Sequence, residues 1–465
     1  MNKAPIYLGV LALGGAAVGL GQIHSATAGQ DRTRGGGGNR SGQLIGADVI
    51  VGSINGVQKW SSSNGTSSYS LGTTSCNIGD QVLSWESENM LHPVIPQNMY
   101  RWEDGQLIQI GMSFCKHGFC ALQQSLCGPC SPTGNGCVDS LGIGCSDPYN
   151  SWWNGEQANL GPRSEVNPHT GVFDYPFTAE PIQDGLSRRI QVDNDEFNPT
   201  LHPDARYFGE GLYIHVEDAA AGNGNNNSSV RELGVGSFSS GGYNLSLVGT
   251  TYQMVNPAEL IRELDPDAYV FHVQIPGDGR ATVALTVRPN QDGTYRYTYH
   301  LYNQNVARGF RSLSVVTNTS LVSNIGKSHL EQHSGENYDE VNWSEITTNT
   351  LIGWSTGSWF NNPNFNALRW GMMNTFWFDA PGLPVGGSMV LGYFEGGGSI
   401  TIQGVVPGEP APSIPGDLNN DCIVDGKDLG LLLGAWGTDG GDLNNDGKTD
   451  GEDLGIVLGA WGSNC

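Results

Sequence analysis

The feature that most constrains the fold of this chain is a series of short alternating runs separated by turn residues. In 295–301, tyrosine and leucine alternate with arginine, threonine and histidine, so the two sets would face opposite sides of a strand. Turn sequences such as PGDG at 276–279 lie between such runs. The pattern predicts a mainly β protein, built as an antiparallel β-sandwich, in which only 256–264 is plainly helical. The other clear strand candidates are 268–275, 281–287, 388–394 and 399–406.

Composition narrows the classes of function. The 465 residues include 46 acidic and 22 basic side chains, which give a net charge of −24. Such a surface repels phosphate backbones and anionic lipid headgroups, so we expect neither nucleic-acid binding nor membrane adsorption. The 68 glycines follow no G-x-y period and therefore indicate many tight turns rather than collagen.

The N-terminus has the pattern of a secretory signal. A basic start is followed by an apolar, glycine-containing stretch and by the small residues Ser-Ala-Thr-Ala at 25–28. We predict a signal peptide over 1–28, with cleavage after Ala28, and a flexible Gly-rich leader over 29–45. The alternative is a membrane anchor, which the glycines at 14, 15, 19 and 21 disfavour. The mature protein is therefore expected to be secreted, either extracellular or attached to the cell surface.

Two further boundaries divide the rest of the chain. A polar stretch at 223–229 (NGNNNSS) either separates a Cys-rich β domain over 46–222 from a β-sandwich over 230–406, or is a long loop in one domain. Residues 407–415 contain four prolines and predict a stiff, extended linker. The final segment, 416–465, is a separate module.

This module contains an internal repeat whose two copies begin at Asp417 and Asp442, 25 residues apart. Each copy has oxygen-bearing side chains at loop positions 1, 3, 5, 9 and 12, the spacing that encloses a calcium ion, and position 7 would contribute a backbone carbonyl. Four carboxylates in so short a loop repel one another unless a cation lies among them. We therefore predict two EF-hand-like loops that bind two Ca²⁺ ions. The predicted ligands are Asp417, Asn419, Asp421, Ile423, Asp425 and Asp428 in the first loop and Asp442, Asn444, Asp446, Lys448, Asp450 and Asp453 in the second.

Each loop is followed by a short apolar helix face that is too small to be buried alone, so the two halves should pack together. In an oxidising compartment, Cys422 and the terminal Cys465 would form a disulfide that closes the module. The two apolar faces consist of Leu429, Leu432, Leu433 and Trp436, and of Leu454, Val457, Leu458 and Trp461.

These residues resemble a type I dockerin, a duplicated F-hand module. The cysteine in the first loop, the paired LGAWG motifs and the final cysteine are similar to the GC-type dockerin of large bacterial secretomes. The resemblance implies calcium binding and non-covalent attachment to a cohesin-like receptor or another cell-surface protein. Segments 141–173, 295–305 and 361–380 resemble recurring blocks of secreted proteins that carry this dockerin type.

Seven cysteines precede the linker. In a secreted protein they should form up to three disulfides and leave one thiol, with zinc binding as the alternative. The motif CGPC at 127–130 matches a redox motif but lacks the strand–helix context of thioredoxins. Segment 141–150 faintly resembles the cysteine-rich core of lysyl oxidases, although only His92 and His117 lie nearby and no H-x-H-x-H cluster is present. The seven are Cys76, Cys115, Cys120, Cys127, Cys130, Cys137 and Cys145.

No catalytic signature stands out before the linker. Glu165, Glu210 and Glu217 are default candidates for the carboxylate pair of a glycosidase. Exposed tryptophans could stack on sugar rings, although burial in a β core is the commoner fate of tryptophan. The prediction is therefore a structural or binding cargo carried by the dockerin, and the alternative is a polysaccharide-degrading, glycoside hydrolase-like enzyme or a carbohydrate-binding protein. The tryptophan candidates are Trp152, Trp153, Trp354 and Trp359.

Overall fold

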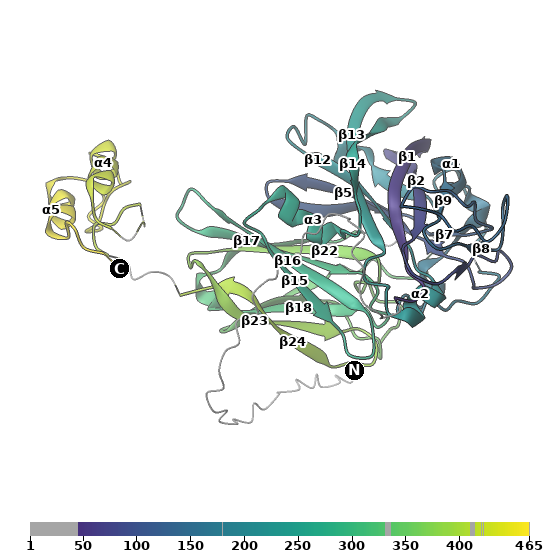
Figure 1. Ribbon diagram of the computed structural model, residues 1–465. Helices are drawn as coiled ribbons and strands as arrows, with labels where there is room; N and C mark the ends of the chain where they lie inside the picture. Colours follow the sequence, from purple (N-terminus) through teal and green to yellow (C-terminus); the bar gives the residue numbers. More distant parts are fainter. Residues whose placement is uncertain are drawn as a thin grey trace, which may run out of the picture. The chain divides into compact units, whose positions relative to one another are not determined.

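The computed structural model describes residues 45–178, 180–330, 336–409, 414–419, 421 and 423–464. The predicted signal peptide, nearly all of the leader, Cys422 and Cys465 lie outside these ranges. The described chain is mainly β, and its sheets are antiparallel, which confirms that part of the prediction (Figure 1). Within these ranges every helix is too short or too polar to cross a membrane.

The first half of the chain begins with a long hairpin of β1 (Val49–Ser63) and β2 (Thr66–Asn77). Asn64 and Gly65 form its two-residue turn with φ angles of 50° and 85°. An Asn-Gly pair suits this turn because both central residues must adopt positive φ. The far edge of β2 pairs with β9 (Ser146–Tyr149) and β11 (Ile190–Asp193).

A five-stranded sheet packs on this hairpin through buried side chains that include Leu71, Met99 and Leu233. The polar stretch 223–227 joins a short helix to β13, which pairs with β12 in this same sheet. In spatial order the strands are β14 (Gly242–Tyr252), β13 (Ser228–Ser239), β12 (Arg206–Leu212), β5 (Gln97–Glu103) and β6 (Gln106–Met112).

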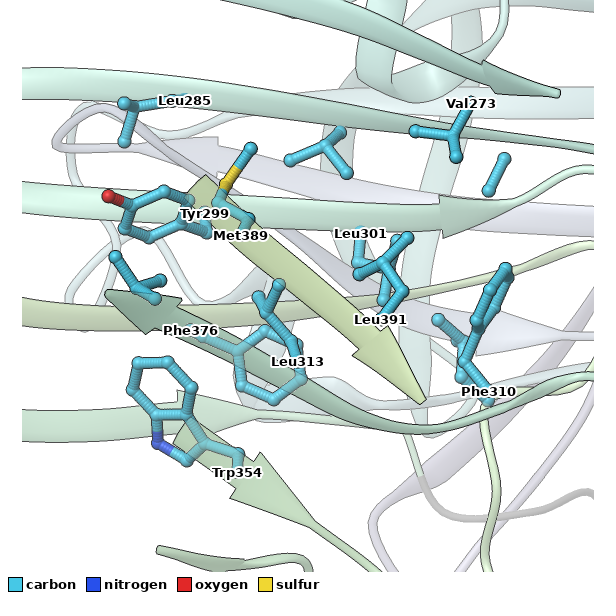
Figure 2. Packing of buried hydrophobic residues seen from close by; sticks show 14 of the residues in the cluster. Val273, Leu285, Tyr299, Leu301, Phe310, Leu313, Trp354, Phe376, Met389 and Leu391 are labelled. Carbon is cyan, nitrogen blue, oxygen red and sulfur yellow. The ribbon is translucent and has the colours of Figure 1, made fainter. Parts of the chain in front are cut away.

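The second half contains two five-stranded sheets that face each other across the largest apolar core. Tyr299, Leu301 and Phe376 of one sheet meet Leu313 and Trp354 of the other (Figure 2). The first sheet has the order β15 (Tyr269–Gln274), β16 (Arg280–Pro289), β17 (Tyr295–Asn303), β22 (Met372–Ala380) and β19 (Ser323–Ser328). The second has β20 (Ser344–Thr348), β21 (Leu351–Ser355), β18 (Phe310–Val316), β23 (Pro384–Tyr393) and β24 (Ser399–Pro407). The five predicted strands coincide with β15, β16, β17, β23 and β24.

The polar face of β17 is buried as well, because the hairpin of β5 and β6 covers it. The backbone N–H of Leu107 donates to His300 Nε2 at 3.0 Å, and Thr375 Oγ1 donates to the Leu107 carbonyl at 2.6 Å. Burial lowers the pKa of His300 to about 3, so its imidazole is neutral at pH 7. The two halves of the chain are therefore joined by satisfied hydrogen bonds as well as by apolar contacts.

The remaining elements are short. The predicted helix at 256–264 is confirmed as α3 (Pro257–Leu264), which Asn256 and Glu259 begin with a reciprocal capping box. The other strands are β3 (Leu83–Ser84), β4 (Val94–Ile95), β7 (Cys115–His117), β8 (Ser140–Leu141) and β10 (Leu160–Gly161). The other helices are α1 (Ser151–Asn154), α2 (Val216–Ala221), α4 (Gly426–Gly434) and α5 (Gly451–Gly459), with 3-10 turns η1 (Gln157–Asn159), η2 (Arg163–Glu165), η3 (Asn194–Phe197) and η4 (Thr319–Leu321).

Candidate functional site

The sequence repeat of the C-terminal module is also a repeat of hydrogen bonds. In the first loop the backbone N–H of Asp421 donates to Asp417 Oδ1 at 3.2 Å. In the second loop the backbone N–H of Asp446 donates to Asp442 Oδ1 at 3.1 Å. The side chains at loop position 1 therefore fold over the backbone at position 5 in both copies.

The aspartates at loop position 12 tie each loop to the helix that follows it. The carboxylate of Asp428 accepts from the backbone N–H groups of Leu418 and Asp425 at 2.9 and 2.8 Å. Asp453 makes the same two contacts in the second copy, at 2.8 and 2.7 Å. Backbone hydrogen bonds hold the pKa of Asp453 below its usual range. The contacts with the backbone of Asp425 and Asp450 are one half of the capping boxes that begin α4 and α5.

The donor set of both loops fits a hard cation, because every predicted side-chain ligand offers oxygen. The loop carboxylates also attract the module's own lysines. Lys427 Nζ lies 2.9 Å from Asp421 Oδ2, and Lys448 Nζ lies 3.2 Å from Asp450 Oδ2. Among the described residues, no three His, Cys, Asp or Glu side chains are gathered as a metal-binding group. Calcium binding by these loops stays a prediction.

Each loop pairs with the segment that follows the helix of the other half of the module. Val424 N donates to the Ser463 carbonyl at 3.1 Å, and Gly462 N donates to the Val424 carbonyl at 2.9 Å. The matching residues 25 positions away also pair, since Gly437 N donates to the Thr449 carbonyl at 2.9 Å. The predicted Cys422–Cys465 disulfide lies outside the described residues, and the residues just inside it, 423 and 464, form an antiparallel bridge.

The prediction that the two halves of the module pack together is confirmed, although half of the residues of the two apolar faces stay largely exposed. Val424, Leu432 and Val457 are fully buried and form the small core. For the two tryptophans the reason is helix length, since α4 ends at Gly434 and α5 at Gly459, so the tryptophans do not continue the helix face. Four side chains of the two apolar faces are about half exposed, namely Leu433, Trp436, Leu458 and Trp461.

Six of the seven cysteines before the linker form three disulfides, as predicted, and their pairing is now defined. Cys127 and Cys130 of the CGPC motif belong to different disulfides. The remaining thiol, Cys115, is buried, and burial raises its pKa to about 12. Three disulfides are typical of proteins that fold in an oxidising compartment. The pairs are Cys76–Cys127, Cys120–Cys137 and Cys130–Cys145.

The two histidines that looked isolated in the sequence pack against each other. The ring centroids of His92 and His117 lie 5.5 Å apart, beside Phe173 and Tyr175. Burial lowers the pKa of His92 to about 4 and that of His117 to about 3. Both imidazoles are therefore neutral members of an aromatic cluster in the described structure.

The three candidate glutamates lie in different environments and form no pair. Glu210 is fully buried under four hydrogen-bond donors, so it is inaccessible to a substrate. Glu217 accepts from the backbone N–H and the hydroxyl of Ser84 at 2.7 Å each. Glu165 accepts from Thr178 and lines a different hollow from Glu217.

The tryptophan candidates divide into buried and exposed ones. Trp354 is fully buried in the core between the facing sheets. Trp152 and Trp153 on α1 are 47% and 40% exposed, and their ring centroids lie 4.8 Å apart. Trp60 of β1, which the sequence did not single out, joins them with its ring centroid 6.5 Å from that of Trp152. No local motif marks Trp60, because the cluster depends on how β1 lies beside α1.

The comparisons with known proteins identify no family. No family model matches the chain, and no curated protein matches it significantly. Among solved structures, the exo-β-D-glucosaminidase CsxA aligns over 72% of this chain and 25% of its own, with 11% identity and a TM-score of 0.15. The chain thus spans a quarter of that enzyme's length. The serine-rich repeat adhesion glycoprotein Srr1 of Streptococcus agalactiae aligns over 76% of this chain and 97% of its own, with 10% identity and a TM-score of 0.16. TM-scores this low support no conclusion about fold or function.

Proposed function

We propose that this chain is a secreted protein that attaches non-covalently to an extracellular or cell-surface partner through its C-terminal module, with a β-sandwich cargo of structural or binding type. The module would bind two Ca²⁺ ions through the ligands named above, and each ion would neutralise the carboxylates of one loop. The resemblance to GC-type dockerins supports a cohesin-like partner.

The observation that carries this proposal is the duplicated pair of exposed apolar side chains on the module. Leu433 and Trp436 on one half, and Leu458 and Trp461 on the other, are each about half exposed. Exposed apolar side chains grouped on so small a module are typical of a surface that binds another protein. The repeat places two such pairs on one module, each following a predicted calcium loop.

The test is retention of a partner by the immobilised full chain. We expect one envelope or secreted protein of the source organism to be retained with calcium and released by chelator. The variant Leu433→Ser/Leu458→Ser should weaken retention by about tenfold or more, since two apolar contacts are lost. Phe238→Ser, which changes an apolar side chain that is 56% exposed on β13, serves as the control. Equal retention with calcium and with chelator would contradict the proposal.

A second candidate function, carbohydrate binding by the cargo, is favoured by the exposed tryptophans alone. Trp152 and Trp153 offer aromatic surface to solvent, and the guanidinium carbon of Arg189 lies 3.8 Å from the ring centroid of Trp60 beside them. Aromatic rings with adjacent polar groups suit sugars, which have apolar faces and hydroxyl edges. Residues 150–159 also contain several amides and a carboxylate.

For this function we expect Trp152→Ala/Trp153→Ala to lose about tenfold in affinity for an insoluble polysaccharide that retains the parent chain. The matched control is Trp359→Ala, since Trp359 is also exposed but packs against Phe360 instead. Sedimentation assays with cellulose, chitin and xylan measure the effect. Equal loss in both variants, or no retention of the parent chain, would remove this candidate.

A further inference from the structure

A cavity of about 380 Å³ lies between segments of the first and second halves of the cargo. Its lining includes η2 and the residues after it from the first half, and residues that flank β22 and β23 from the second half. The volume falls within the range of small-molecule sites in proteins. The sequence did not point to this cavity because its lining residues belong to no common motif.

Part of the lining of the cavity is apolar. Met112, Phe173, Trp370 and Met372 belong to it, and each is at most 5% exposed. These apolar residues favour a ligand that carries an apolar part.

The charged residues of the lining are four carboxylates and two guanidinium groups. Arg163 is turned away from a ligand by its own bonds, since it donates to the carbonyls of Ser113 and Gly371 at 2.7 and 2.9 Å. It also donates to Asn98 Oδ1 at 2.9 Å, and Asn98 in turn donates to the buried carboxylate of Glu210 at 2.7 Å. The charge of Arg163 is therefore balanced outside the cavity. The four carboxylates belong to Glu165, Asp174, Glu336 and Glu395.

The second guanidinium group, that of Arg369, is also held by contacts with neighbouring residues. Arg369 lies between two aromatic rings, with its guanidinium carbon 4.2 Å from the ring centroid of Tyr338 and 4.5 Å from that of Phe394. Its Nη2 donates to the Pro363 carbonyl at 2.7 Å. The carboxylates of the lining therefore dominate the charge that a ligand in the cavity would meet.

Among the four carboxylates of the lining, Glu336 gives the strongest indication of a ligand. Its Oε1 accepts from the backbone N–H groups of Arg163 and Ser164 at 2.7 and 3.3 Å. Its Oε2 is buried and has no hydrogen-bond partner among the described residues. Burial also raises the pKa of this carboxyl group, so the charged form would gain from a cation placed beside it.

We propose that this cavity binds an organic ammonium group carried on a short apolar stem, with Glu336 as the residue that pairs with the ammonium. A buried acceptor and further carboxylates at Glu165 and Glu395 suit the ammonium end of such a ligand, and the apolar lining residues suit its stem. The same chemistry is offered by a free diamine and by the lysine side chain of a protein.

The test is calorimetry on the full chain at 150 mM salt, with 1,5-diaminopentane and Nα-acetyl-lysine amide as probes. Diacetylated lysine amide, which lacks the charge, is the control ligand. We expect at least one charged probe to bind about tenfold or more tightly than the neutral one. Tighter binding of the diamine would indicate a free amine as the natural ligand, and tighter binding of the lysine derivative would indicate a protein side chain.

The variants separate pairing with Glu336 from general attraction to a chain of net charge −24. Glu336→Gln should weaken binding of the charged probe by about tenfold. Glu345→Gln makes the same charge change at an exposed carboxylate that pairs with Lys327 at 3.2 Å, and it should leave binding unchanged. Glu395→Gln, at the exposed rim of the cavity, should weaken binding severalfold and does not depend on a buried substitution being tolerated. Equal effects of Glu336→Gln and Glu345→Gln, or equal binding of charged and neutral probes, would overturn the proposal, as would no binding of either charged probe at millimolar concentration.

Discussion

Replacement of Glu210 by alanine is expected to lower the free energy of unfolding of the cargo by about 3–5 kcal/mol, the usual cost of breaking a buried, paired charge. Glu210 is fully buried and accepts from Asn98 Nδ2, Tyr100 Oη and Ser228 Oγ at 2.7, 2.7 and 2.6 Å, and also from Tyr302 Oη. Its removal leaves all four donors without their acceptor.

The same substitution also removes a carboxylate that balances the charge of the Arg163 guanidinium. Arg163 is 3% exposed and reaches Glu210 through the side chain of Asn98. Leaving a buried charge unpaired costs more folding free energy than losing a hydrogen bond between neutral groups. Because the network joins strands of both halves of the chain, the loss should appear in one cooperative unfolding transition.

Guanidinium chloride unfolding, followed by tryptophan fluorescence, measures this effect. Glu210→Gln keeps the side-chain volume and one acceptor, so its effect should be smaller. Glu232→Gln is the control, since Glu232 lies on the neighbouring strand β13 in a salt bridge with the exposed Arg206. Such surface pairs contribute little to stability. A loss of less than about 1 kcal/mol in Glu210→Ala would show that the network is not a major source of stability.

Removal of calcium is expected to abolish the protection of the C-terminal module against hydrogen exchange while the cargo stays folded. Among the described residues of the module, the fully buried apolar side chains are Val424, Leu432 and Val457, a core too small for independent stability. A ligand present at 100 times its dissociation constant slows unfolding-dependent exchange by about 100-fold. We therefore expect chelator to speed exchange in α4 and α5 by about that factor.

Exchange measured by mass spectrometry on the full chain locates the effect. Asp417→Ala/Asp442→Ala should reproduce the effect of chelator in the presence of calcium. Asp439→Ala removes a carboxylate of the same module outside the predicted ligands and should keep the protection. If protection in α4 and α5 is the same with calcium and with chelator, the loops are ordinary acidic turns and the proposed attachment loses its calcium dependence.

Local pattern was a good guide to the elements of this protein. The alternating run at 295–301 predicted β17, and Asn256 and Pro257 predicted the start of α3, because a strand and a helix start depend mostly on neighbouring residues. The helices predicted after the two loops are present for the same reason, and the aspartates at loop position 12 lie in the first turn of α4 and of α5. The pattern did not locate the helix ends. It extended the apolar faces to Trp436 and Trp461, but α4 and α5 end before these residues and leave them about half exposed.

Residues that meet only through the fold could not be assigned in advance. His92 and His117 looked isolated and are neighbours, and the partner of each cysteine depends on loops that the sequence does not order. Glu210 was a default catalytic candidate, while Glu336, which carries no motif, lines the cavity. Sequence spacing contains little information about such contacts, because they join segments that are far apart along the chain.

By itself, the sequence determined that the chain forms many antiparallel strands and ends in two copies of one loop and helix, because alternation, turn residues and caps act over a few residues. Only the tertiary structure decided which faces are buried. The polar side of β17, with Thr298 and His300, would lie in water in a lone sheet, yet the hairpin of β5 and β6 covers it. That outcome depends on where two distant sheets pack, since a buried polar face is stable only when another part of the chain satisfies its hydrogen bonds.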